Sequence, residues 1–235
     1  MSEYKEVFKR TEIKYLLTED QFQSLFLYLN KIAKVDSYGK TRINNIYFDT
    51  PGFRLIRTSL EKPLYKEKLR LRTYGNTEDD TNSFIEIKKK YDGIVYKRRI
   101  SQSYKNAYNY LVKNGRLSEE SQIAKEIDSL REMYPGLQPA MTICYDRIAM
   151  AGIEDPDFRV TFDTNIQWST DALDLRKSPG GKPLLKPGEY MMEIKVANAM
   201  PIELCQVLSE LKIFPTSFSK YGRGYLDMIR SECVC

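Results

Sequence analysis

Residues 65–73 read YKEKLRLRT, a stretch in which charged and apolar side chains alternate. Successive side chains of a β-strand point to opposite faces, so the four alternating cations share one face and the two leucines share the other. The charged face carries Lys66, Lys68, Arg70 and Arg72. A single strand of this kind is typical of any half-solvated antiparallel sheet, so the fold depends on whether other strands repeat the pattern.

Other stretches with strand character repeat it, and at least five place a Lys or Arg on the charged face. The remaining strands are expected at 8–17, 41–49, 82–90, 94–101, 140–149, 158–162, 165–169 and 189–196. The charged-face sets are Glu86 with Lys88, Val95 with Lys97 and Arg99, Tyr145 with Arg147, and Glu193 with Lys195. Asp92 and Gly93 form the dipeptide of a tight hairpin between two of these strands. The sequence therefore predicts an antiparallel sheet with one basic face.

Amphipathic helices are expected between the strands. Thr18 and Gln21 match a capping box at the start of a helix near Glu19. Further helices are expected at 104–112, from about 118 to before 135, from about 201, and at 225–230, with a mobile loop at 175–188. If the helices cover the apolar face, the charged faces meet inside a barrel. The Lys and Arg side chains there repel one another unless a bound anion neutralises their charge. We predict an α+β fold: an eight-stranded antiparallel β-barrel clad by α-helices, with a tunnel for phosphate.

Three carboxylates, Glu12, Glu86 and Glu193, each lie two residues before a lysine on the same strand face: Lys14, Lys88 and Lys195. Each pair can be an ordinary ion pair. Together the three carboxylates can also form a site of hard oxygen ligands for Mg²⁺ or Mn²⁺, the usual companions of a triphosphate. The chain has no histidine, so its chemistry must use carboxylates, Lys, Arg, Tyr or a bound metal.

Length and composition bound the remaining possibilities. The 235 residues suit one domain over 1–235, and a net charge of +5 is too modest to identify a partner. The four cysteines lack the spacing of a zinc site, which favours reduced thiols. Because no apolar signal segment or stretch long enough to span a membrane is present, we expect a cytoplasmic protein.

Six ordered segments, at 8–15, 46–49, 68–72, 86–88, 145–147 and 218–221, resemble the VTC-type polyphosphate polymerase domain of the triphosphate tunnel metalloenzymes. The resemblance extends over nearly the whole chain. It implies an eight-stranded tunnel that takes ATP, transfers the γ-phosphoryl group to a growing inorganic polyphosphate chain, and releases ADP. It also implies a set of phosphate-binding, catalytic residues: Lys14, Arg70, Arg72, Lys88, Lys97, Arg147 and Lys220.

The resemblance further implies hydrogen bonds to substrate from Tyr145 and Ser219, and a divalent metal on Glu193. Lys195 joins the substrate-binding candidates because it shares a strand face with Glu193. The sequence departs from the family pattern at Ser217, where a further basic residue is common; that phosphate contact is either missing or supplied by Lys212 or Arg223.

The triphosphatase branch of the superfamily typically shows Glu-x-Glu-x-Lys in its first strand, whereas this chain has Arg10 at the first acidic position. That replacement favours polymer binding over two-metal hydrolysis. A tripolyphosphatase or nucleoside triphosphatase, and a non-catalytic polyphosphate sensor, remain as alternatives. No nucleic acid is expected as a partner, because the basic strands lack an aromatic stacking platform. The sequence does not determine the oligomeric state.

Overall fold

The structure, a computed structural model, describes residues 11–92, 94–113, 115, 117, 121–177, 180–197 and 199–233. Within this part of the chain the strands are β1 (Thr11–Leu17), β2 (Ala33–Asp49), β3 (Tyr65–Tyr74), β4 (Asn82–Tyr91), β5 (Ile94–Ser103), β6 (Gln138–Gly152), β7 (Arg159–Ser169), β8 (Lys182–Pro183), β9 (Tyr190–Val196) and β10 (Pro215–Thr216). The helices are α1 (Glu19–Leu29), α2 (Arg54–Leu60), α3 (Tyr104–Val112), α4 (Gln122–Met133), α5 (Ile202–Glu210) and α6 (Lys220–Glu232), with a 3₁₀ turn, η1, at Leu175–Lys177. The predicted α+β class is confirmed.

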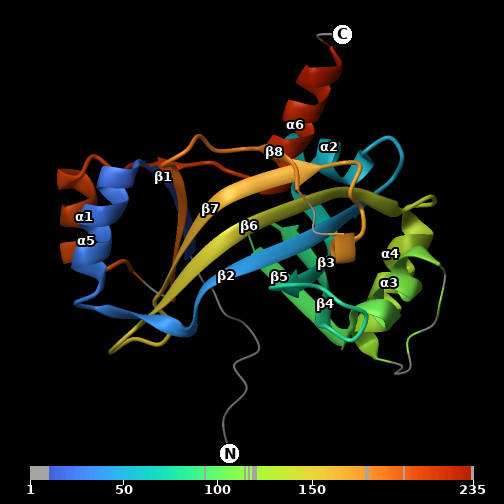
Figure 1. The fold of residues 1–235 in the computed structure, drawn as a ribbon, viewed down its shortest axis with the longest axis horizontal. Helices are drawn as coiled ribbons and strands as arrows, with labels where there is room; N and C mark the ends of the chain where they lie inside the picture. Colours follow the sequence, from blue (N-terminus) through green and yellow to red (C-terminus); the bar gives the residue numbers. More distant parts are fainter. Residues whose placement is uncertain are drawn as a thin grey trace, which may run out of the picture. The chain divides into compact units, whose positions relative to one another are not determined.

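The strands are hydrogen-bonded in the order β10-β1-β9-β7-β6-β2-β3-β4-β5, with β8 beside β7 (Figure 1). The order starts at β10 and ends at β5, and no pairing between these two edge strands occurs among the described residues. A closed eight-stranded barrel is therefore not confirmed. Strand alternation fixes which face a side chain occupies, but closure depends on the tilt and stagger of the strands, which alternation does not encode.

Two compact units share this sheet. The first unit comprises Met1–Thr41, Asp146–Asn165 and Leu185–Phe218, and the second comprises Arg42–Tyr145, Ile166–Leu184 and Ser219–Cys235. The strands β2, β6 and β7 continue from one unit into the other. None of the described helices is long and apolar enough to cross a lipid bilayer.

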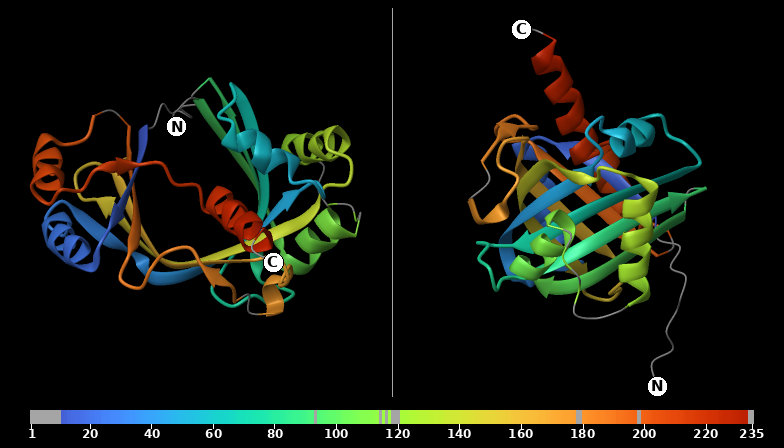
Figure 2. Two further views of the ribbon diagram at one scale, coloured as in Figure 1. Left: turned by 90° about the horizontal axis from the view of Figure 1, so that it is seen from above. Right: turned by 90° about the vertical axis from the view of Figure 1, so that its right-hand side faces the viewer.

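In the first unit, helices α1 and α5 lie side by side (Figure 2). They pack on the apolar face of β1, β7 and β9, where Val160, Met192 and Ile194 are buried together with Leu25 and Leu204. The predicted capping box is present: the Gln21 N–H donates to Thr18 Oγ1 at 3.3 Å, and the Thr18 N–H donates to Gln21 Oε1 at 3.0 Å. The charged side chains of these strands therefore occupy the face opposite the helices.

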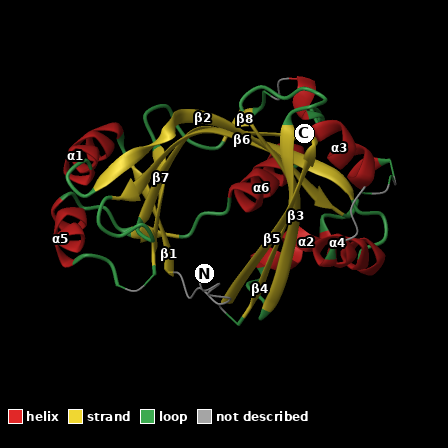
Figure 3. Ribbon diagram, turned by 90° about the horizontal axis from the view of Figure 1, so that it is seen from below, coloured by secondary structure: helices red, strands yellow, loops and turns green. Residues whose placement is uncertain are grey.

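In the second unit, α3 and α4 cover one side of β3, β4 and β5, while α6 lies on the other side (Figure 3). The covered face holds four buried aliphatic residues: Leu69, Leu71, Ile85 and Ile87. They pack against Tyr104 and Ala107 of α3 and against Ile127 and Leu130 of α4. The faces that alternation predicted for residues 65–73 are confirmed, and so is the covering of the apolar face by helices.

The β4–β5 hairpin has the predicted two-residue connection, because Tyr91 pairs with Ile94. Asp92 has a φ of +45°, the left-handed backbone that a tight turn of this kind requires. Gly93, and Phe8 at the predicted start of the first strand, lie outside the described residues.

Several predicted boundaries are wrong. The expected strands 158–162 and 165–169 are a single strand, β7, and α6 begins at Lys220, five residues before the predicted start. The short elements α2, β8 and β10 were not predicted, because two- to seven-residue segments show too little periodicity to stand out.

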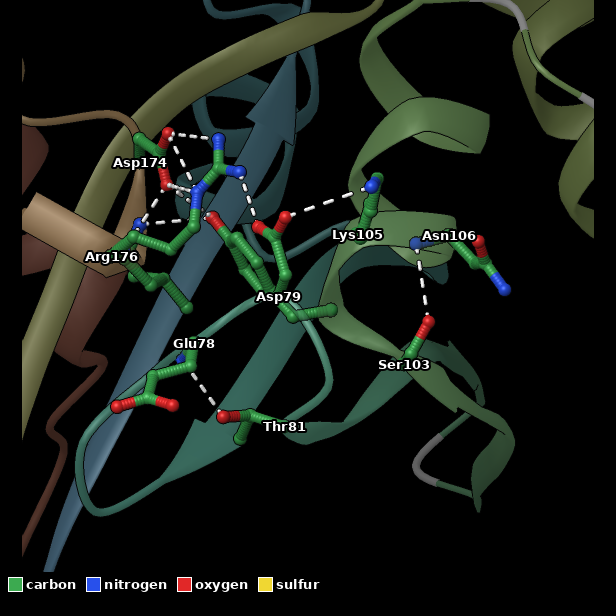
Figure 4. A network of polar contacts seen from close by, with 10 residues as sticks. Glu78, Asp79, Thr81, Ser103, Lys105, Asn106, Asp174 and Arg176 are labelled. Carbon is green, nitrogen blue, oxygen red and sulfur yellow. Dashed lines mark hydrogen bonds and ion pairs between the residues drawn. The ribbon is translucent and has the colours of Figure 1, made fainter.

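The sequence predicted a mobile loop at 175–188, but ion pairs of Arg176 in η1 hold the beginning of this loop in place (Figure 4). Arg176 makes ion pairs with Asp174 at 2.6 Å and with Asp79 at 2.7 Å, and Asp79 also contacts Lys105 at 3.8 Å. The Tyr104 hydroxyl donates to Asp174 at 3.0 Å. These contacts fasten the start of the β7–β8 connection to α3 and to the β3–β4 loop.

Candidate anion-binding site

The predicted site residues divide between the two units. Arg70, Arg72, Glu86, Lys88, Lys97, Tyr145, Ser219 and Lys220 belong to the second unit, and Glu12, Lys14, Arg147, Glu193 and Lys195 to the first. Within each unit the structure brings the members together on the strand face that the helices α1, α3, α4 and α5 leave uncovered.

The basic face of the second unit consists of the cations on the uncovered side of β3, β4 and β5: Lys66, Lys68, Arg70, Arg72, Lys88, Lys90, Lys97 and Arg99. The strand register makes Lys68, Lys88 and Lys97 cross-strand neighbours, and Lys66 lies opposite Lys90. Like charges directly opposite each other destabilise a sheet. Burial, and then the neighbouring lysines, lower the pKa of Lys66 below its ordinary value. A bound anion would therefore relieve the repulsion between the cations of this face.

On the uncovered side of β3, β4 and β5, Glu86 is the only carboxylate among the described residues. It lies in the middle of the eight cations, opposite Arg70 of β3 and Arg99 of β5. Its Oε2 atom is 2.6 Å from both Nε and Nη2 of Arg70 and 3.8 Å from Nε of Arg72, and its Oε1 atom is 2.6 Å from Lys97 Nζ. The side chain is only 2% exposed. Burial alone would raise the pKa of Glu86, but Arg70, Arg72 and Lys97 lower it to about 2. Glu86 therefore stays ionised and acts as an internal counter-ion.

In Lys97, unlike Glu86, the surroundings favour the neutral form of the side chain. Burial lowers its pKa, Glu86 raises it, and the positive charges of Arg70 and Arg72 lower it again, which leaves the pKa at about 8. The side chain is still 43% exposed, so its ammonium group can reach a ligand in solution. Near neutral pH this lysine carries a proton that a bound anion would hold more firmly.

Arg72 is the most enclosed cation of the basic face, with 6% of its surface exposed. Its Nε donates to Asn45 Oδ1 at 2.9 Å, and its Nη2 donates to the Tyr145 hydroxyl at 3.3 Å. Lys220 Nζ lies 4.7 Å from the centroid of the Tyr145 ring, within cation–π range. The predicted phosphate ligands Arg72, Tyr145 and Lys220 thus form one connected group.

The start of α6 is tied to the basic face through Ser219. Its Oγ atom accepts the Gly222 N–H at 3.2 Å, which makes Ser219 the N-cap, and it also accepts a hydrogen bond from Lys68 Nζ at 3.1 Å. The helix approaches β6 and β7 closely: a Cβ on Gly224 would lie 2.7 Å from Met141 Sδ and 3.2 Å from Trp168 Cβ. Glycine at 224 thereby lets α6 pack tightly enough to hold Ser219 and Lys220 in place.

The sequence interpretation missed two polar residues of this site, Asn45 and Tyr47 of β2, and left Lys68 out of the set of ligands. Tyr47 Oη accepts a hydrogen bond from Arg70 Nη1 at 3.1 Å, and both Tyr47 and Asn45 pair with cations of β3. The sequence shows polar residues at alternate positions 45, 47 and 49. The whole stretch from Ile43 to Asp49 is buried, however, and its composition is typical of a strand in the protein core. The proposed substitutes for the basic residue absent at Ser217, Lys212 and Arg223, are both exposed, and their roles stay predictions.

The first unit carries a mixed cluster of acidic and basic residues. Lys14 Nζ is 2.7 Å from Glu12 Oε1 and 3.8 Å from Glu193 Oε2, and Lys195 Nζ is 2.6 Å from Glu193 Oε1. Burial and Glu12 raise the pKa of Glu193, whereas Lys195 and Lys14 lower it, and the pKa lies below its ordinary value. The ion pairs considered for Glu12 and Glu193 are therefore present.

Arg147 of the first unit has its own partner. It donates from Nε and Nη2 to the two carboxylate oxygens of Asp163, at 2.6 and 2.8 Å. This bidentate contact orients the guanidinium of Arg147, whose role as a phosphate ligand stays a prediction.

The donor set of the first unit fits a divalent cation held mainly by a substrate. Glu12 and Glu193 supply two carboxylates, and Mg²⁺ commonly takes only one or two from a protein when phosphate oxygens complete its shell. Thr161 lies opposite Glu193 in the register, and its buried hydroxyl has no hydrogen-bond partner among the described residues, which leaves one more oxygen available. The residues that the structure describes contain no cluster of three acidic, cysteine or histidine ligands. Glu86 belongs to the other unit, and its predicted role as a metal ligand competes with three cations for the same two oxygens.

The sequence profile of the VTC domain matches residues 9–229. The chain belongs to the VTC domain family. The resemblance inferred from the ordered motifs is thereby confirmed, and the match includes every predicted site residue of both units.

Solved structures share the fold of this VTC domain. Two are described as "putative adenylate cyclase": the Bacillus halodurans protein is 17% identical, with 88% of this chain and 92% of that one covered at a TM-score of 0.54. The Vibrio parahaemolyticus protein is 11% identical, with coverages of 92% and 97% and a TM-score of 0.50. A third, described as a "putative adenylyl cyclase" from Hippeastrum that reveals a dominant triphosphatase activity, is 14% identical, with coverages of 92% and 95% and a TM-score of 0.53. At these identities the likeness concerns the fold alone.

Proposed function

We propose that this VTC domain is an ATP-dependent polyphosphate polymerase, which transfers the γ-phosphoryl group of ATP to a growing polyphosphate chain. The observation that carries the proposal is the basic face: β3, β4 and β5 present eight cations on their uncovered side against one buried carboxylate, Glu86. The whole chain has a net charge of only +5, so this local excess is a specific feature. An extended phosphate polymer carries enough charge to neutralise it.

The reaction suits these residues because it requires positioning and charge neutralisation more than a covalent catalyst. An ionised terminal oxygen of the acceptor polyphosphate forms a bond to the γ-phosphorus of ATP, the bond from that phosphorus to the β,γ-bridging oxygen breaks, and ADP leaves. The attacking oxygen carries no proton, so no general base is needed, in accord with a chain that lacks histidine. Arg70, Lys88 and Lys97 would hold the transferring group, and Lys68, Ser219 and Lys220 would hold the neighbouring phosphates.

A divalent metal, Mn²⁺ or Mg²⁺, would be held by Glu193 and Glu12 and would supply further neutralisation of phosphate charge. The residues of the first unit, including Arg147 and Lys195, would bind phosphate oxygens through their own cationic groups. The predicted cytoplasmic location fits a supply of ATP and remains part of the proposal.

The decisive experiment is incubation of the purified protein with ATP and Mn²⁺, followed by gel analysis of polymer and measurement of ADP and free phosphate. Long-chain polyphosphate with one ADP released for each phosphate unit added supports polymerisation. Release of phosphate without polymer supports the triphosphatase alternative, in which water is the acceptor, as the activity described for the Hippeastrum protein suggests. Tight binding of polyphosphate without nucleotide turnover supports a sensor.

A matched pair of variants tests the basic face itself. Arg98 and Arg99 are consecutive, exposed residues of β5 that point to opposite faces, with Arg99 on the basic face and Arg98 beside Glu126 of α4. We expect Arg99→Ala to weaken tripolyphosphate binding severalfold in calorimetry, and Arg98→Ala to leave it unchanged. Equal effects of the two substitutions would refute the assignment of the site to this face.

A further inference from the structure

Tyr47 is a buried tyrosine of β2 whose hydroxyl points at a cation of the basic face. It lies opposite Arg70 in the register, and Arg70 Nη1 donates to its Oη at 3.1 Å. The Arg70 guanidinium also lies 5.9 Å from the centroid of the Tyr47 ring. Cross-strand pairing brings the two residues near each other, and the hydrogen bond gives the phenol oxygen a defined partner among the phosphate-binding candidates.

The hydrogen bonds of Arg70 leave part of its guanidinium available. The group has five N–H donors. Nε donates to Glu86 Oε2, Nη2 forms an ion pair with the same oxygen at 2.6 Å, and one N–H of Nη1 donates to Tyr47. Among the described residues Arg70 has no other hydrogen-bond partner, so at least two N–H groups, one on each terminal nitrogen, remain for a ligand, and the side chain keeps 21% of its surface exposed. Glu86 and Tyr47 together therefore fix the plane of the guanidinium from two sides.

Tyr47 is itself held by a second tyrosine. Its ring stacks on the ring of Tyr221 in α6, with centroids 4.6 Å apart and planes 13° apart. The Tyr221 hydroxyl donates to Asp49 Oδ2 at 2.8 Å, and Asp49 also accepts the backbone N–H groups of Thr50, Leu55 and Ile56. Asp49 and Tyr221 are almost fully buried. A rigid carboxylate at the end of β2 thus fixes Tyr221, and Tyr221 fixes Tyr47.

We propose that Tyr47 is a positioning residue for anion binding: its phenol oxygen holds the Arg70 guanidinium so that the two remaining N–H groups meet a phosphate. The proposal rests on the anion site of the proposed function and adds a residue that acts through Arg70. A bidentate contact between guanidinium and phosphate depends on the orientation of the guanidinium plane, so an Arg70 held by Glu86 alone binds less tightly.

The charges around Tyr47 give this role a measurable pH dependence. Lys68, Arg70 and Arg72 of β3 act on the phenol, and Tyr221, which is hydrogen-bonded to Asp49, stacks on its ring. Tyr145 accepts a hydrogen bond from Arg72. Burial raises the pKa of Tyr47, but Arg70, Lys68 and Arg72 together lower it to about 8. Above that pH a phenolate pairs with Arg70 and opposes a bound phosphate. The contribution of Tyr47 to affinity is therefore favourable below pH 8 and diminishes as pH rises.

The test is calorimetric titration of the full chain with metal-free tripolyphosphate between pH 6.5 and 9.5, for wild type, Tyr47→Phe and Tyr221→Phe. We expect Tyr47→Phe to bind about tenfold less tightly at pH 7, the cost of one hydrogen bond to a charged group. The ratio of wild-type to variant affinity should then fall as pH passes 8, and the titration of tripolyphosphate itself cancels in this ratio. Tyr221→Phe, which keeps the stack but loses Asp49, should weaken binding about threefold. Tyr91→Phe, on the opposite face of β4 and exposed, is the control and should match wild type.

Each outcome decides the proposal. If wild type does not bind tripolyphosphate, the anion site and the role of Tyr47 are both wrong. If wild type binds and the Tyr47→Phe ratio stays at one, or stays constant across the pH range, only the positioning role is overturned. A variant that melts at a lower temperature but shows a flat ratio has lost a purely structural contact, which also overturns it. Unchanged affinity of Tyr221→Phe overturns the transmission through the stacked rings.

Discussion

Replacing Glu86 by glutamine removes the one negative charge at the centre of the basic face while keeping the shape of the side chain. The pKa of Glu86 is about 2 against an ordinary 4.5, which corresponds to a net stabilisation of the ionised form by about 3 kcal/mol, once the cost of burial is set against the attraction of Arg70, Arg72 and Lys97. We therefore expect Glu86→Gln to lower the free energy of unfolding by about 3 kcal/mol at pH 7 and low salt.

The pH dependence follows from the direction of this pKa. A carboxyl group whose pKa is lower in the folded state stabilises fully above its unfolded value, near pH 4.5, and loses that contribution as pH falls toward 2. The stability difference between wild type and Glu86→Gln should therefore shrink between pH 4.5 and 2. Glu78→Gln is the matched control, because Glu78 is exposed and the substitution changes the net charge by the same amount.

Anion binding should change in the opposite direction from stability. Removing a negative charge about one contact distance from a phosphate gains about 1 kcal/mol in a water-like medium, or about fivefold in affinity for tripolyphosphate. Urea unfolding can be followed by the fluorescence of Trp168, the single tryptophan, which lies in the same unit as Glu86. Calorimetry gives the affinity. Stability equal to that of Glu78→Gln would refute the counter-ion role. Weaker binding that occurs only when Mn²⁺ is present would favour the predicted role of Glu86 as a metal ligand.

Three further predictions concern the remaining parts of the site. Tripolyphosphate affinity should fall as pH rises from 7 to 9, because the Lys97 ammonium, with a pKa of about 8, loses its proton. In the same calorimetric series Lys97→Arg should lose less affinity, because arginine stays protonated. Gly224→Ala should reduce unfolding free energy by about 1 to 2 kcal/mol in urea titrations, since its Cβ would crowd Met141 and Trp168, and an unchanged midpoint would mean that α6 adjusts freely. Glu193→Gln should reduce Mn²⁺-dependent turnover of ATP at least tenfold while metal-free tripolyphosphate binding stays within twofold of wild type; a parallel loss of both would assign Glu193 to the folding of the first unit instead.

The local part of the fold was predictable because it depends on neighbours in the sequence. Alternation at residues 65–73 correctly separated Leu69 and Leu71 from Arg70 and Arg72, and Thr18 with Gln21 correctly marked the start of α1. The hairpin at Asp92 was likewise encoded in a dipeptide. Such features follow from the two-residue period of a strand and from hydrogen bonds that join residues close in the chain.

The sequence by itself determined which residues can meet an anion, since the period of a strand assigns every side chain to a face. Strand alternation alone places Arg70, Lys88 and Lys97 on the charged faces of their strands, and the register confirms that these form one face. Only the tertiary structure decided which of them are available. Arg72, expected to bind phosphate in a tunnel, is enclosed by Asn45 and Tyr145, and Glu86, expected as a metal ligand, is surrounded by three cations. It also brought Tyr221 of α6 onto Tyr47 of β2, from a distance of more than 170 positions in the sequence. Burial and pairing of this kind arise when separate strands and helices pack, so no pattern within a single segment can reveal them.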